Sequence, residues 1–78
     1  MAATKDQRRL LNRCIVDDVP VFVLTGTDAC AMTALMAYAA QARAMGCDKA
    51  FIHDLETNVI PDFRDFQRDE PDKVRLPD

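Results

Sequence analysis

The sequence has few of the residue types on which most enzyme and cofactor sites depend. It contains one histidine, two glycines and no tryptophan in 78 residues. A phosphate cradle uses several glycines so that backbone amides can approach the anion, and usually a lysine or arginine completes it. One histidine and so short a chain also leave little room for a preorganised catalytic centre. We therefore predict a protein that is not an enzyme and needs no cofactor.

The cysteines do not form a disulfide or metal framework. Cys14, Cys30 and Cys47 are odd in number and widely spaced, and no two make a CxxC pair. With His53 they could complete a Cys3His zinc site, but the close ligand pair typical of structural zinc is missing. No apolar signal segment precedes them, so we expect free thiols and a cytoplasmic protein. A thiol or zinc protein stays as a second alternative.

Long apolar runs are also missing. The most apolar window, residues 29–42, is shorter than the roughly 20 residues of a membrane span, and Asp28 and Arg43 bracket it. We expect no membrane partner. A single domain of this size buries only about 60–65% of its unfolded surface, so its core is thin and assembly into a homodimer or higher homo-oligomer is expected.

Positive charge is concentrated in the first 13 residues. They carry Lys5, Arg8, Arg9 and Arg13 against Asp6 alone, whereas the remainder has six basic and twelve acidic residues. An acidic body repels a phosphate backbone, so nucleic acid is not an expected partner. The basic arm could hold an acidic partner or a few phosphates, or it could be the solvated face of a helix.

The first part of the chain predicts a helix and a strand. Thr4 and Gln7 match a capping box, and we expect a short helix over residues 5–13. Pro20 favours extended backbone before it, and residues 21–24 are an apolar, β-branched run typical of a strand. Two partners are open to this strand: residues 14–16 in a small hairpin, or the same strand of a second chain. Val21 and Val23 are the candidates for an exposed edge.

Residues 29–45 give the strongest helix prediction. Eight of these seventeen residues are alanine, and Gly46 stands where a left-handed residue ends a helix. One stripe is expected to face the core: Met32, Leu35, Met36 and Ala39. A second, smooth stripe carries almost no charge and could let another backbone approach closely: Thr33, Ala37, Ala40 and Ala44, with Tyr38 at its margin. Surface alanines that contact nothing are the alternative interpretation.

A third helix is predicted from residue 49 to residue 68. Asp48 can cap it, and a short link makes it an antiparallel hairpin with the second helix. Its apolar side chains recur at spacings of three and four: Ile52, Leu55, Val59, Phe63 and Phe66. Pro61 should either kink this helix or divide it in two.

The stretch VFVLTGTDACAM has the outline of a strand that leads to an anion site at a helix N-terminus. Only one glycine, Gly26, is present there, and the carboxylate of Asp28 would repel a phosphate. Capping of the next helix by Thr27 or Asp28 explains the pattern more simply. If an anion does bind, the contacts to expect are Arg8, Arg9, Gly26 and Thr27.

The succession VPVFVLTGTD, an Ala-rich helix ending in MGCD, and DFRDFQRDEPDKVRLPD resembles small uncharacterised proteins of gut Bacteroidales and of prophages or other mobile elements. The matching features are a PVFxLxxxD segment at residues 20–28, Gly46, and the aromatic–glutamine pair Phe66 and Gln67. The resemblance implies an accessory role in a phage or mobile element, and it transfers no activity or ligand.

Together these observations predict a single α+β domain over residues 1–78, mostly α. We expect a basic arm or helix at residues 1–19, a strand or small hairpin with an antiparallel helical hairpin at residues 20–68, and a polar tail at residues 69–78. The expected function is a non-enzymatic, homo-oligomeric protein–protein interaction module whose protein partner the sequence does not identify. The first alternative is an oligomer that sequesters a nucleotide or another small anion.

Overall fold

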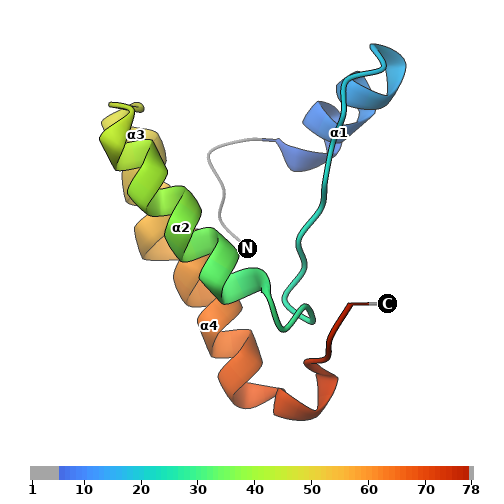
Figure 1. The fold of residues 1–78 in the computed structure, drawn as a ribbon, viewed down its shortest axis with the longest axis vertical. Helices are drawn as coiled ribbons and strands as arrows, with labels where there is room; N and C mark the ends of the chain where they lie inside the picture. Colours follow the sequence, from blue (N-terminus) through green and yellow to red (C-terminus); the bar gives the residue numbers. More distant parts are fainter. Residues whose placement is uncertain (1–5, 78) are drawn as a thin grey trace.

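Two long helical segments lie side by side and form the body of the molecule (Figure 1). The computed structural model describes residues 6–77, and 67% of this part of the chain is helical. Helix α2 (Ala31–Ala44) packs against α3 (Lys49–Asp54) and α4 (Ile60–Asp69), which are joined by a π-helical turn, η1 (Leu55–Val59). Helix α1 (Gln7–Val16) stands apart, and the 3-10 turn η2 (Pro71–Lys73) follows α4.

The predicted α+β class is wrong, because residues 6–77 contain no strand and no β hairpin. Residues 14–16, one of the two candidate partners for the strand, belong to α1. Asp6 caps this helix by accepting a hydrogen bond from the Arg9 amide (3.1 Å), and the Val19 amide then donates to the Cys14 carbonyl (2.9 Å). Local helical hydrogen bonds thus replace a two-stranded hairpin, which is only marginally stable in water. Thr4 of the expected capping box and Lys5, the expected first residue of this helix, lie outside the described residues.

The C-terminal end of α2 follows the predicted chemistry, but the N-terminal end does not. The N-cap of α2 is Cys30, which makes no side-chain capping hydrogen bond, so the prediction that Thr27 or Asp28 caps this helix is wrong. Asp28 instead accepts a hydrogen bond from the amide of Cys30 itself (2.7 Å), just before the first turn. At the other end Gly46 has a φ of 72°, and its amide donates to the Arg43 carbonyl. The Cys47 amide reaches the Ala42 carbonyl (3.0 Å), which completes a Schellman motif. The prediction of Gly46 as the left-handed terminating residue is confirmed.

The last helix continues through Pro61 without a break. Asp48 caps α3 as predicted, by accepting from the Ala50 amide (2.7 Å). Directly after α3 the Ile60 amide donates to the Leu55 carbonyl, five residues back, and this opens the helix into the π-turn η1. Pro61 then lies in the first turn of α4, directly after η1, and has no amide to donate to the preceding turn.

The core lies between α2 and the composite α3–η1–α4 helix and is thin. Ala39, Leu55 and Ile60 form its buried centre, and half-buried apolar side chains surround it: Met32, Leu35, Phe51 and Val59. Met36, which the sequence places on the core face of α2, is 56% exposed instead. Ala31 and Ala42 are buried instead. The buried face of α2 is therefore narrower than the apolar pattern of the sequence suggests.

Candidate protein-interaction site

The most exposed apolar surface belongs to the N-terminal arm, which we define as residues 6–25. After α1 the chain turns and runs extended through residues 19–25 toward the helical body (Figure 1). A shallow hollow of about 400 Å³ lies between α1 and this segment, with Leu10, Leu11 and residues 21–24 in its lining. No residue of α1 is buried. The arm is therefore a separate, loosely packed unit.

The extended segment leaves its backbone without partners. In the part of the chain that the structure describes, residues 21–24 make no backbone hydrogen bond. Their side chains are exposed as well: Val21 by 51%, Phe22 by 84% and Val23 by 60%, and only Leu24 is half-buried. Exposed amide and carbonyl groups in an extended apolar segment form a template for pairing with another chain.

The outer face of α2 is a second apolar surface. All four residues of the smooth stripe are exposed: Thr33, Ala37, Ala40 and Ala44. Tyr38, at the margin, is about half-exposed and makes an edge-to-face contact with Phe51, with ring centroids 6.2 Å apart. The stripe lies on the body and Val21 and Val23 lie on the arm, so the interface candidates occupy two separate surfaces (Figure 1).

The four residues named as anion contacts do not come together. Gly26 and Thr27 border an open hollow of about 510 Å³, with Asp62, Phe63 and Phe66 around it. Arg8 borders the other hollow, beside the extended segment. The carboxylate of Asp62 and the aromatic rings disfavour an anion in the first hollow. Thr27 does not cap α2; its hydroxyl pairs with that of Thr25 at 2.8 Å.

Gln67 and Arg75 are two structural residues that the sequence did not single out for contacts. The Gln67 side-chain amide donates to the carbonyls of Gly26 (3.1 Å) and Asp28 (2.9 Å). The Arg75 amide donates to the Thr27 carbonyl, and its carbonyl accepts from the Ala29 amide, both at 2.9 Å. The loop before α2 is thus fixed from α4 and from the tail. The sequence feature that could have indicated this contact is the polar residue Gln67, which lies next to Phe66 on the inward face of a helix.

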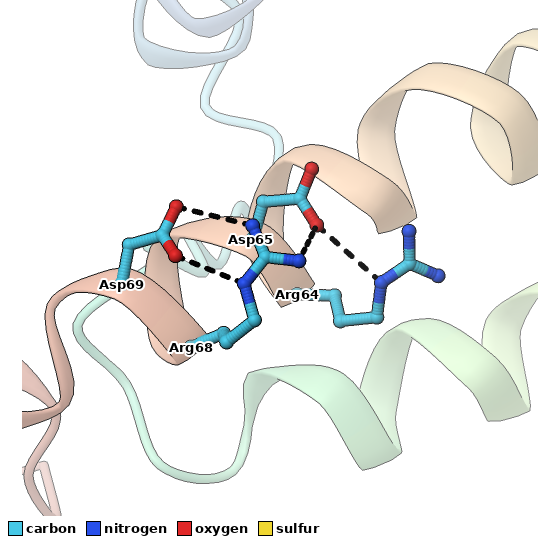
Figure 2. Close-up of polar contacts among 4 residues, drawn as sticks. All are labelled: Arg64, Asp65, Arg68 and Asp69. Carbon is cyan, nitrogen blue, oxygen red and sulfur yellow. Dashed lines mark hydrogen bonds and ion pairs between the residues drawn. The ribbon is translucent and has the colours of Figure 1, made fainter.

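Four of the six basic side chains of the body form ion pairs within the body. On α4, Arg68 contacts Asp69 (2.9 Å) and Asp65 (3.4 Å), and Arg64 also contacts Asp65, as Figure 2 shows. The hydrogen bond from Arg68 lowers the pKa of Asp69. Arg43 similarly pairs with Glu56 through two hydrogen bonds and lowers the pKa of that carboxyl.

Helix α1 differs from the body in this respect. Its three arginines, Arg8, Arg9 and Arg13, form no ion pair with any residue in the range 6–77. Residues 19–77 carry six basic and nine acidic side chains. Helix α1 therefore offers three unpaired arginines near an exposed apolar segment, although Asp6, Asp17 and Asp18 balance their charge over the arm as a whole, while the body is acidic.

The cysteines are free, Cys14 half-buried and Cys30 and Cys47 exposed. Within residues 6–77 no three His, Cys, Asp or Glu side chains lie close enough together to hold a metal ion. No helix in this range has the length and apolar character needed to cross a membrane. Comparisons with protein-family models, with curated proteins and with solved structures gave no match.

Proposed function

We propose that this protein is a non-enzymatic interaction module that assembles with copies of itself and uses the arm as its main contact. The observation that carries the proposal is the extended segment at residues 21–24, whose backbone makes no hydrogen bond within residues 6–77 and whose Phe22 side chain is 84% exposed. A chain with so little core gains stability when another chain covers such a segment. The smooth stripe on α2 is the second contact surface.

The size of the surface supports assembly. The accessible area is 6074 Å², whereas a folded monomer of 8.8 kDa exposes about 4,800 Å². The radius of gyration is 13.4 Å, against about 11.5 Å for a compact chain of this length. The excess area over a compact monomer is about 1,300 Å². A stable interface needs about 800 Å² from each partner.

Charge gives a secondary support. Asp65 and Asp69 of α4 are already paired with Arg64 and Arg68 (Figure 2), whereas Asp62 forms no ion pair within residues 6–77. When two arms associate, the unpaired arginines of α1 can therefore approach unpaired carboxylates on the body of the other copy. Such complementarity raises the rate of association more than its final strength.

Native mass spectrometry and light scattering test the proposal. Both are run at protein concentrations from about 5 to about 100 μM, a range that covers micromolar dissociation constants. The expected result is an integer multiple of the 8.8 kDa chain. Val21→Asp with Val23→Asp should give a folded monomer, and Ala37→Glu with Ala40→Glu should weaken assembly of a higher oligomer. Met45→Glu is the matched control, because Met45 is 70% exposed but lies on neither surface. A wild-type protein that stays monomeric throughout would overturn the proposal.

A further inference from the structure

The two edges of the extended segment are not equivalent. In an extended chain, successive residues direct their amide and carbonyl groups to opposite edges. One edge carries the groups of Val21, Val23 and Thr25, and the other carries those of Phe22 and Leu24 together with Pro20. Proline has no amide hydrogen, so the second edge lacks one donor. The first edge is complete, and it is the better one for pairing.

The groups on this edge complement themselves. The amides of Val21, Val23 and Thr25 and the carbonyls of Val19, Val21 and Val23 make no backbone hydrogen bond within the described range. When two such edges run antiparallel with Val21 opposite Val23, every one of these donors meets one of these acceptors. The Val19 amide and the Thr25 carbonyl, which this arrangement leaves out, are already bonded within their own chain.

We infer that residues 19–25 of two copies pair antiparallel about a two-fold axis at Phe22. The inference rests on the proposed self-assembly and adds the partner segment and its register. Phe22 then faces Phe22 of the second copy at a position without backbone hydrogen bonds, where Cα atoms lie about 4.5 Å apart and side chains contact each other. Each chain remains helical on its own, and the two-stranded ribbon exists only between chains.

A second copy is the occupant that this segment favours. Residues 19–25, VPVFVLT, carry no charge, so pairing with themselves brings no like charges together. A two-fold arrangement uses the same edge of both chains and closes after two copies, which avoids open-ended growth along an exposed edge. It also brings Phe22, the most exposed phenylalanine, of both copies together. The two rings then form an apolar centre that the arm of a single chain lacks.

Single cysteines test the register in a background in which Cys14, Cys30 and Cys47 are alanine. With oxidised glutathione as the oxidant, Phe22→Cys should form a disulfide-linked dimer at least about five times faster than Val21→Cys or Val23→Cys. Equivalent residues at position 22 lie within the Cα range of a disulfide, whereas those at 21 or at 23 are too far apart. Fastest cross-linking at any other position would overturn the inference.

A second experiment keeps Phe22 in place. A 15N-labelled Val21→Cys protein mixed with unlabelled Val23→Cys protein should give a mixed-mass disulfide dimer, because residue 21 of one chain lies opposite residue 23 of the other. Val21→Cys alone is the control and should stay largely unlinked. If the wild-type protein is oligomeric by mass but neither experiment gives the expected product, the register is wrong while the proposed self-assembly stands. A monomeric wild-type protein would remove both.

Discussion

The ring of Phe66 lies so close to Gly26 that a Cβ atom at position 26 would be only 3.0 Å from its Cδ1 atom. This contact places α4 directly against the loop that leads into α2. We expect Gly26→Val to lower the free energy of unfolding by about 1–3 kcal/mol, because a branched side chain must displace the ring. Urea denaturation at fixed protein concentration measures the change.

A double-mutant cycle tests the cause of this effect. Phe66→Leu removes the ring edge, so the further cost of Gly26→Val should be smaller in the Phe66→Leu background than in the wild type. Equal costs in the two backgrounds would show that the ring is not what excludes a side chain at position 26.

Gly46 is required for a different reason. Its φ of 72° is a left-handed backbone conformation, and no atom lies within 4 Å of where its Cβ would be. Gly46→Ala should therefore cost about 1 kcal/mol through backbone strain alone. Gly46→Asn should cost less, since asparagine tolerates this conformation better. Thermal unfolding followed by circular dichroism measures both, and an alanine variant as stable as the wild type would contradict the expectation.

Gln67 connects α4 to the loop before α2 through two hydrogen bonds. Gln67→Met keeps the length of the side chain but leaves the carbonyls of Gly26 and Asp28 without these donors. We expect a loss of about 1–2 kcal/mol in the free energy of unfolding. Gln41→Met is the matched control, because Gln41 is exposed on α2. Faster amide hydrogen exchange at residues 26–30 should accompany the loss, and equal effects of the two variants would contradict a specific role for Gln67.

The pair of Arg43 and Glu56 predicts a pH effect of known sign. The hydrogen bond from Arg43 lowers the pKa of Glu56 below its usual 4.5 in the folded protein. The contribution of this pair to stability is therefore complete above that value and is lost as the pH falls through the lower folded pKa. Glu56→Gln should unfold more readily than the wild type at pH 7, and the difference should shrink toward pH 3.

High salt provides a second check on this pair. The Arg43 side chain is 62% exposed and that of Glu56 is 31% exposed, so 1 M NaCl should also reduce the difference between Glu56→Gln and the wild type at pH 7. A difference that is independent of both pH and salt would show that packing of the side chain, and not its charge, is responsible.

The local signals in the sequence predicted two of the helix ends correctly, the end of α2 and the start of α3. Gly46 and Asp48 act at single positions through backbone conformation and capping, so the residue type decides the outcome. Residues 14–16 were harder to place because β-branched Ile15 and Val16 suit a strand, but a strand needs a partner and a helix does not. The capping of α1 by Asp6 tips that balance toward helix.

Contacts between residues far apart in the sequence could not be predicted from the spacing of residue types. The hydrogen bond from Gln67 to Gly26 spans 41 residues, and the bridge between Asp28 and Arg75 joins the loop to the tail. Neither pairing leaves a periodic trace in the sequence. The interface residues Val21, Val23 and Ala37 are exposed in the single chain, and whether they meet another chain stays a prediction that the experiments above address.

The π-turn at Leu55–Val59 amounts to one surplus residue in an otherwise α-helical segment. Each residue of an α-helix advances the side-chain direction by about 100°. If these five residues wound as a regular α-helix instead, the surplus residue would therefore rotate α4 by that angle relative to α3. Phe66 and Gln67 would swing away from Gly26 and Asp28 while their local sequence stayed intact. The π-turn therefore determines the direction in which Phe66 and Gln67 point, and with it the contact between α4 and the loop before α2.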